Sequence, residues 1–262
     1  MTSELVIVGG GNMGAALLGG LIAAGRAPGE LAVAEPLAPR RDELAAAFPG
    51  VTIGADVAAA RGAVIAVKPP DVAAATAAAV AAGAGRVLSI AAGVAIATIE
   101  ASAGVGVAVV RAMPNTPALI GQGASAIAAG SSADEAALGW ATEILGAVGT
   151  VDRVAEHQLD AVTALTGSGP AYVFLLAEAL IDAAVGAGLA RPLATRLTTQ
   201  LLVGSSALLA DRGDAAALRA MVTSPGGTTA AAIAQLERHA LRAAVADAVD
   251  AAARRSAELR VD

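Results

Sequence analysis

The sequence has no cysteine, one lysine and two histidines among its 262 residues. The absence of thiols excludes disulfides and thiolate metal sites. His157 and His239 alone do not supply the ligands of a zinc site, so we predict no bound metal. Aromatic residues make up 2% of the chain, which means that the core consists of aliphatic side chains and that its helices pack closely.

Charge is scarce as well. Charged residues make up 15% of the chain, against roughly 25% in an average soluble domain, and the net charge is −6. A chain without a basic surface does not neutralise a phosphate backbone. We therefore expect no nucleic-acid partner.

Long uninterrupted apolar runs are also missing from the sequence. A membrane span needs about 20 predominantly apolar residues. The uncharged stretch Ala112–Ala133 contains two prolines and three glycines, and Glu178 and Asp182 interrupt the run from Ala171 to Ala190. The amino terminus enters an apolar run directly, without a basic segment before it. We expect no membrane partner and a cytoplasmic location.

What the chain does have is small apolar residues: 56% of it is hydrophobic, and 74 residues are alanine. That composition excludes a disordered chain, which requires low hydrophobicity and high charge. In residues 1–153, short β-branched runs alternate with alanine-rich helical stretches. This alternation predicts an α/β domain of the Rossmann type, with a mostly parallel, doubly wound sheet. The expected strands are Leu5–Val8, Leu31–Ala34, Val51–Ile53, Ala63–Val67, Val87–Ile90 and Val107–Val110.

No convincing strand follows in residues 154–262, where long amphipathic stretches dominate. Pro170 and Pro192 suit the first turn of a helix, since the missing N–H costs nothing there. We predict an all-helical second domain. Its expected helices are Glu156–Leu165, Pro170–Gly188, Pro192–Asp211, Asp214–Met221, Thr228–Glu237 and His239–Leu259.

A glycine motif follows the first expected strand. Gly9-Gly10-Gly11-Asn12-Met13-Gly14 fits the G-x-G-x-x-G pattern, in the strand–turn–helix context that the pattern requires. Gly9 permits the tight turn, Gly11 lets the backbone approach a pyrophosphate, and Gly14 lets helix and strand pack closely. We predict a dinucleotide site here, with Asn12 and Met13 opening the helix whose N-terminus binds the phosphates.

Two signals for the adenosine end of the cofactor conflict. Glu35 ends the second expected strand, where an acid usually accepts from the ribose 2′-OH and favours NADH. Arg40 and Arg41 follow closely, and an arginine there accommodates the 2′-phosphate of NADPH. The sequence leaves both cofactors possible, and it leaves open that the two arginines form only a solvated helix face.

Five further segments, taken together with the glycine motif, resemble the pyrroline-5-carboxylate reductase family in order and spacing over essentially the whole chain. Ser-Pro-Gly-Gly-Thr-Thr is the most specific of them. The segments are Ala66-Val67-Lys68-Pro69, Ser89-Ile90-Ala91-Ala92-Gly93, Arg111-Ala112-Met113-Pro114-Asn115-Thr116-Pro117, Thr166-Gly167-Ser168-Gly169-Pro170-Ala171-Tyr172 and Ser224-Pro225-Gly226-Gly227-Thr228-Thr229.

The resemblance implies reduction of the C=N bond of L-1-pyrroline-5-carboxylate to L-proline, the final step of proline biosynthesis, usually with NADPH. It also implies a helical domain that dimerises and a decamer of five dimers. Ala66, Val67, Lys68 and Pro69 would line the nicotinamide end of the cofactor together with Ala91, Ala92 and Gly93, and Asn115 would lie near the cofactor. Ser224, Gly226, Gly227, Thr228 and Thr229 would bind the substrate, with Thr229 bonded to the ring nitrogen as the catalytic residue.

The residues are consistent with this chemistry. The substrate is a carboxylate, and the Ser224–Thr229 loop precedes a helix whose free N–H groups bind such an anion. Thr229 donates or accepts a hydrogen bond, but its hydroxyl is too weakly acidic to be a general acid. A simple helix cap remains the bland interpretation of this loop. Glu156, at the start of the second domain, is interpreted as an acid that compensates a helix dipole.

Two other functions compete with this one. A β-hydroxyacid-type dehydrogenase has the same two-domain plan but needs a lysine in the helical domain, and the only lysine here is Lys68. A non-catalytic nucleotide-binding protein is the second alternative. It would have no need for the Ser224–Thr229 loop, and detectable turnover would exclude it.

Overall fold

The computed structural model describes residues 2–260 and divides the chain into two compact units. The first unit contains the chain up to Ser168 and again from Ala251, and the second unit is Gly169–Asp250. The predicted domain boundary at 153/154 lies earlier than this division. The helical segment after it still packs on the sheet through Leu159, which is 1% exposed.

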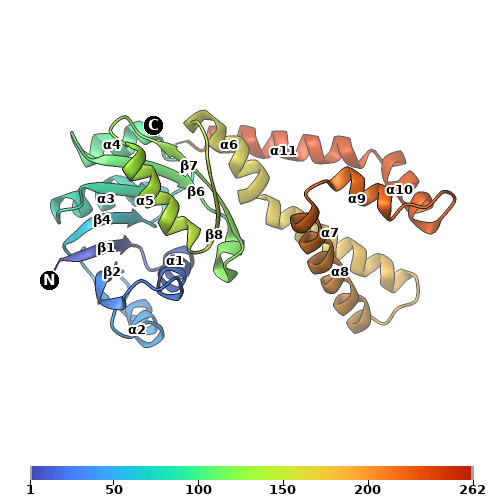
Figure 1. Cartoon of the computed structure of the whole chain (residues 1–262), viewed down its shortest axis with the longest axis horizontal. Helices are drawn as coiled ribbons and strands as arrows, with labels where there is room; N and C mark the ends of the chain where they lie inside the picture. The colour runs from blue at the N-terminus through green and yellow to red at the C-terminus, as the bar shows by residue number, and fades with distance from the viewer. Residues whose placement is uncertain (1, 261–262) are drawn as a thin grey trace. The chain divides into compact units, whose positions relative to one another are not determined.

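The first unit is built on one eight-stranded sheet with the order β3-β2-β1-β4-β5-β6-β7-β8 (Figure 1). The first six strands run parallel, β7 is antiparallel to β6, and β8 is parallel to β7. The prediction of a mostly parallel sheet is confirmed. The strands are β1 Ser3–Val8, β2 Leu31–Ala34, β3 Thr52–Gly54, β4 Ala60–Ile65, β5 Arg86–Ser89, β6 Ala108–Met113, β7 Gly123–Ala129 and β8 Gly149–Arg153.

Helices cover both faces of this sheet, as its alternating side chains require. Leu5 and Ile7 of β1 belong to one core cluster, while Val6 and Val8 belong to the other. The first cluster includes side chains of α1 Asn12–Ala23, α2 Ala38–Ala47 and α5 Glu135–Gly146. The second includes side chains of α3 Val72–Ala81, α4 Ile96–Ala103 and α6 Leu159–Val162.

The expectation of six strands was incomplete, because β7 and β8 were missed. The sequence of β7, GASAIAA, contains a single β-branched residue, and its small side chains gave no strand signal. The edge strand β8, GTVDR, is polar and largely exposed. The expected strand Ala63–Val67 is shifted, because β4 ends at Ile65 and leaves Ala66 and Val67 in the following loop.

The second unit is all-helical in its described residues, as predicted. Pro192 lies in the first turn of α8, and Gly188, with φ of +103°, lies between α7 and α8. The last helix, α11, crosses from the second unit into the first. The helices after α6 are α7 Gly169–Gly186, α8 Arg191–Arg212, α9 Ala215–Met221, α10 Thr228–Arg238 and α11 Leu241–Glu258.

The expected helix Glu156–Leu165 is not continuous α-helix. It consists of a 3-10 turn, Glu156–Gln158, the short α6 and a π-helical turn, Thr163–Gly167. Pro170 has no N–H, so it cannot donate to the carbonyl of Thr166 four residues earlier. The side-chain amide of Asn115 donates to that oxygen instead, at 3.1 Å. A side chain from the sheet domain thus satisfies a carbonyl that the N–H-lacking Pro170 cannot.

Candidate functional site

The glycine loop joins β1 to α1, and two of its glycines are required by packing. Gly9 has φ of +105°, and a Cβ on it would lie 2.5 Å from the carbonyl oxygen of Ala66. A Cβ on Gly14 would lie 2.1 Å from the carbonyl oxygen of Gly9. A Cβ on Gly11 would meet nothing within 4 Å. Gly11 therefore borders open space at the N-terminus of α1, where Asn12 and Met13 begin the helix. This is where the glycine motif predicts a pyrophosphate.

Glu35 and the two arginines surround this loop at the end of β2. The Glu35 side chain accepts from the backbone N–H of Gly10 at 2.9 Å and from that of Leu37 at 3.0 Å, and the residue is 6% exposed. Both carboxylate oxygens of Glu35 thus hold backbone segments in place. Arg40 donates from Nε to the carbonyl of Gly10 at 2.7 Å, and Arg41 donates to the carbonyls of residues 35 and 36.

The loops after β4 and β5 lie beside the glycine loop. Strands β1, β4 and β5 are parallel neighbours, so their carboxyl ends lie at one edge of the sheet, where nucleotides bind in this fold. Lys68 has an extended backbone and precedes the 3-10 turn Pro69–Asp71. Ala91 is 5% exposed, and Gly93 has φ of +76°. The topology therefore brings the predicted segments Ala66–Pro69 and Ala91–Gly93 to the predicted pyrophosphate site.

The side-chain amide of Asn115 connects two other segments of the chain. It is 9% exposed, its Nδ2 donates to Thr166, and its Oδ1 accepts from the N–H of Ala124 at 2.9 Å. Because both ends of its amide are engaged, any contribution of Asn115 to the cofactor site passes through the segments that it connects. Its predicted proximity to the cofactor stays a prediction.

The Ser224–Thr229 loop lies in the second unit and leads into α10. Gly226 has φ of +69°, and Gly227 is the N-cap of α10, with its N–H donated to the carbonyl of Ser224 at 3.1 Å. No side chain caps this helix, so the N–H groups of its first turn are free to bind an anion. Thr229 is partly exposed, and its hydroxyl makes no hydrogen bond within residues 2–260. The loop thus has the donors that a carboxylate ligand requires.

Sequence reasoning did not predict the contacts that Glu156 and Arg111 make near the start of α4. Glu156 was interpreted as compensating a helix dipole, and its carboxylate does accept from the first N–H of a helix, but that helix is α4, through Ile96 at 2.7 Å. The same oxygen pairs with Arg111, which is 4% exposed. These contacts join segments far apart in the chain, so no local sequence signal could have indicated them.

A cavity of about 610 Å³ lies at the opposite edge of the sheet. Arg26 forms an ion pair with Glu143 in its lining, and the Arg86 guanidinium stacks 4.7 Å from the centre of the Trp140 ring. Burial, together with the nearby Arg26, lowers the pKa of Arg86. Arg86 begins β5, so the cavity lies at the amino ends of the strands, away from the edge where this fold binds nucleotides.

Comparisons with known proteins agree with this geometry. The sequence model described as pyrroline-5-carboxylate reductase dimerisation matches residues 156–259, and the one described as NADP oxidoreductase coenzyme F420-dependent matches residues 4–93. A pyrroline-5-carboxylate reductase of Mycobacterium tuberculosis is 46% identical over 287 aligned residues, covering 99% of this chain and 97% of its own. The Synechocystis enzyme of that name is 43% identical and covers 99% of both chains. This chain belongs to the pyrroline-5-carboxylate reductase family.

Solved structures of this family share the fold. The pyrroline-5-carboxylate reductase of Coxiella burnetii superposes with a TM-score of 0.93 at 36% identity and covers all of both chains. A Plasmodium falciparum pyrroline carboxylate reductase, solved with NADP bound, gives a TM-score of 0.84 at 28% identity over 99% of this chain and 98% of its own. The order of the sheet and the helical second unit are therefore those of pyrroline-5-carboxylate reductases.

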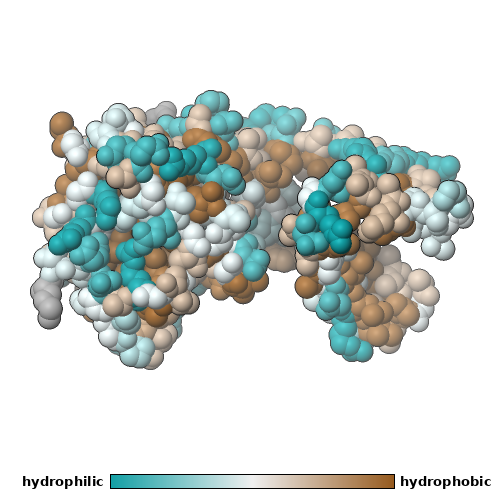
Figure 2. Space-filling model, in the orientation of Figure 1, coloured by the Kyte–Doolittle hydropathy of each residue, from teal (hydrophilic) through white to brown (hydrophobic). Residues whose placement is uncertain are grey.

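The dimerisation domain of this family explains an exposed apolar helix. Residues 173–176 of α7 are Val, Phe, Leu and Leu, each about half exposed or more, and together they point to all sides of the helix. A helix that is apolar all round is normally buried. The helical stretch Glu156–Gly186 is long and apolar enough to cross a membrane by length and composition. This was not expected from the sequence, because Glu178 and Asp182 interrupt the apolar run. Figure 2 shows apolar surface around α7 and α8.

We expect the full-length protein to be a dimer or a multiple of dimers, since a second copy of the chain would cover α7. The variant Leu175→Glu places a charge in that apolar face, where Leu175 is 66% exposed in the single chain, and should shift the protein toward monomer. Light scattering after size-exclusion chromatography measures both states. A monomeric parent protein would contradict this prediction, and Glu30→Gln, at an exposed site in the first unit, is the control substitution.

Proposed function

We propose that this chain reduces the C=N bond of L-1-pyrroline-5-carboxylate to L-proline with NADPH as the hydride donor. The observation that carries the proposal is the uncapped, glycine-containing turn Ser224–Thr229 at the start of α10, in a chain that also has an open glycine loop at the start of α1. The family relationship supports the same activity. Because this reaction is the last step of proline biosynthesis, the chain is proposed to act there.

The cofactor fits the residues of the first unit. Gly9, Gly11 and Gly14, with Asn12 and Met13, would hold the pyrophosphate against α1, because the space beside Gly11 is open. Bound NADPH supplies the hydride that the reduction needs. The chain itself supplies the other contacts, with Asn115 supporting the loop that follows β6. Glu35, Arg40 and Arg41 lie on the adenosine side, and the nicotinamide side is formed by Ala66, Val67, Lys68, Pro69, Ala91, Ala92 and Gly93.

The substrate fits the turn in the second unit. Free N–H groups at the start of α10 would bind the carboxylate, and Gly226 and Gly227 present no side chain that would block its approach. The Thr229 hydroxyl would hydrogen-bond the ring nitrogen. A protonated C=N bond is already a strong electrophile, so reduction requires one hydride on carbon, and the nitrogen keeps its proton. The protein then mainly positions the two reactants.

A direct assay tests this function. Purified protein is mixed with pyrroline-5-carboxylate and either NADPH or NADH, and the absorbance of the reduced nicotinamide is followed. Consumption of reduced cofactor is expected with both substrates present and not with either omitted. A folded oligomer that consumes neither cofactor would overturn the proposal, and it would favour a different imine substrate or a non-catalytic role.

NADPH is proposed over NADH because of the contacts around Glu35. Its two carboxylate oxygens already accept from Gly10 and Leu37. Arg40 donates to the glycine loop at Gly10, and Arg41 donates to the carbonyls of residues 35 and 36, so two cations lie at the end of β2. The variant Arg41→Ala should lower kcat/KM for NADPH by about 10- to 100-fold, as expected for a lost hydrogen bond between charged groups. Activity with NADH should stay nearly unchanged.

The ratio of the two kcat/KM values measures this preference. Arg61→Ala is the control, because Arg61 is exposed and lies in β4 near its amino end. A parent enzyme that prefers NADH, or an Arg41→Ala variant that loses both activities equally, would contradict the proposal.

Assembly beyond the dimer is proposed as a decamer of five dimers, which the family resemblance suggests. The exposed apolar surface of the second unit supports self-association but does not distinguish a dimer from a ring. Analytical ultracentrifugation of the full-length protein distinguishes the two, and a stable dimer at micromolar concentration would exclude the decamer.

A further inference from the structure

The loop that joins β5 to α4, Ile90–Ala95, has no polar side chain of its own, and Ala91 and Val94 pack into the core at its two ends. It consists of small or aliphatic side chains, and Gly93 adopts φ of +76°. It lies at the carboxyl edge of the sheet, after a strand next to β4, which in turn pairs with β1. The contacts that order this segment, which we call the β5–α4 loop, therefore bear on any ligand at this edge.

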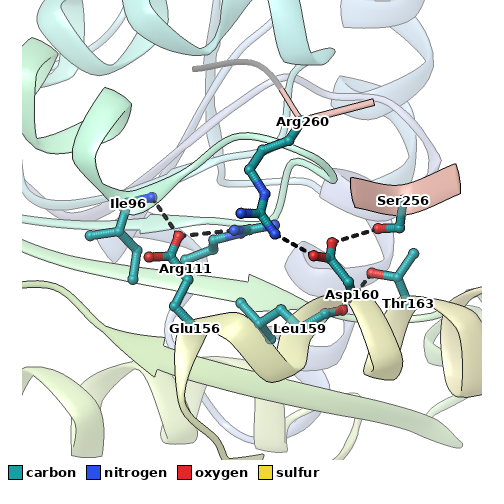
Figure 3. Close-up of polar contacts among 8 residues, drawn as sticks. All are labelled: Ile96, Arg111, Glu156, Leu159, Asp160, Thr163, Ser256 and Arg260. Atoms are coloured by element: carbon teal, nitrogen blue, oxygen red, sulfur yellow. Dashed lines mark hydrogen bonds and ion pairs between the residues drawn. The ribbon is translucent and has the colours of Figure 1, made fainter. Parts of the chain in front are cut away.

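Glu156 holds the end of this loop (Figure 3). Its Oε1 accepts from the N–H of Ile96, the first residue of α4, at 2.7 Å and from Arg111 at 2.9 Å. The Arg111 side chain is 5% exposed and that of Glu156 is 37% exposed, so this ion pair is partly shielded from solvent. A negative charge at the N-terminus of α4 also stabilises that helix.

Asp160, one helical turn after Glu156, holds the carboxyl-terminal end of α11 (Figure 3). Its Oδ1 accepts from the hydroxyl of Ser256 at 2.8 Å, and its Oδ2 pairs with Arg260. The Asp160 side chain is only 14% exposed. The carbonyl oxygen of Leu259 is thereby held 3.1 Å from the position that a Cβ on Gly93 would occupy.

We propose that Glu156 and Asp160 are positioning residues that clamp the β5–α4 loop from two sides, and that the Asp160–Arg260 pair couples the carboxyl-terminal end of α11 to binding of the nicotinamide cofactor. The inference rests on the proposed function, because that function puts the cofactor against this loop. A loop ordered before the ligand arrives binds it more tightly, since the entropy of ordering is not lost on binding. Releasing Arg260 removes one side of the clamp and leaves the Glu156–Arg111 pair intact.

The test is cofactor binding, measured by the fluorescence of NADPH titrated with the full-length protein. Arg260→Ala should raise the Kd by about fivefold or more, the lower end of typical coupling between linked elements. At saturating cofactor, kcat should change less than KM for NADPH. Arg260→Lys should recover much of the affinity, because it restores a cation beside Asp160.

The matched control is Arg255→Ala, which removes an exposed pair with Glu258 on the same helix end. It should leave the Kd unchanged. Asp160→Asn keeps the size of the side chain and removes its charge, so it tests the clamp with little risk to folding, and it should also raise the Kd.

Linkage supplies a second readout that does not depend on activity. If the clamp raises cofactor affinity, the cofactor must stabilise the clamp by the same factor. Hydrogen exchange at the amides of Leu259 and Arg260 should slow when NADPH is added to the parent protein, and Arg260→Ala should show less slowing. Equal Kd values for the parent, Arg260→Ala and Asp160→Asn would overturn the inference. A parent protein that binds no nicotinamide at all would instead overturn the proposed function on which it rests.

Discussion

Gly14→Ala is expected to lose both stability and cofactor binding, whereas Gly11→Ala is expected to lose cofactor binding alone. A Cβ at position 14 would stand 2.1 Å from the carbonyl oxygen of Gly9, closer than any real contact, so helix α1 and strand β1 would have to separate. Such overpacking costs about 3 kcal/mol, which lowers the Tm of a chain of this size by roughly 6–12 °C. The displaced helix N-terminus would no longer face the pyrophosphate.

At position 11 the added methyl group meets no protein atom within 4 Å, so the fold should tolerate it. The methyl group would occupy space that the pyrophosphate needs and would displace it from the N-terminus of α1. We expect the displaced cofactor to bind about 100-fold more weakly. Calorimetry for Tm and fluorescence titration for NADPH measure the two effects separately.

Gly19→Ala is the control in the same helix, because its Cβ would make an ordinary contact at 3.4 Å with Phe48. It should leave binding unchanged and should raise helix stability slightly. If Gly11→Ala bound NADPH as tightly as the parent protein, the glycine loop would not be the pyrophosphate site.

The second large effect is expected at Thr229. Thr229→Val keeps the shape of the side chain but removes its hydroxyl, which has no partner within residues 2–260. We expect kcat/KM for pyrroline-5-carboxylate to fall by about 10- to 100-fold, as for a lost hydrogen bond to a charged group. The Kd for NADPH and the Tm should stay close to the parent values, because the hydroxyl supports neither the glycine loop nor the helix.

Thr229→Ser should retain most of the activity, since it keeps the donor and acceptor. Thr199→Val is the control, because the Thr199 hydroxyl bonds only to its own helix, at the carbonyl of Thr195. Unchanged turnover of Thr229→Val would remove Thr229 from the reaction and leave the backbone N–H groups of α10 as the main substrate contacts.

Local patterns were sufficient where the structure depends on local rules. The alternation of strands and helices, the glycine turn and the prolines at helix starts each follow from residues within a few positions of one another. Strands β7 and β8 were missed because their own residues do not determine that they form strands. A strand of small residues such as β7 forms because β6 lies beside it and offers hydrogen bonds, and its own sequence has little β preference.

The candidate site also has features that local motifs predicted and contacts that only the folded chain shows. The motifs located the glycine loop and the Ser224–Thr229 turn, and the geometry of both turns agrees with the roles of their glycines. The contacts of the Glu35 carboxylate with Gly10 and Leu37 were not predicted, because they depend on how α2 and the loop fold back on β2.

The sequence alone therefore determined the family, the two-part architecture and the turns of the site, since these depend on residue types at short, fixed spacings. Only the tertiary structure decided which charges meet: Glu156 with Arg111 and the N-terminus of α4, and Asp160 with Arg260, a hundred residues away. A carboxylate that is partly removed from water is stabilised by the partners that satisfy it, and those partners come together only when the whole chain has folded.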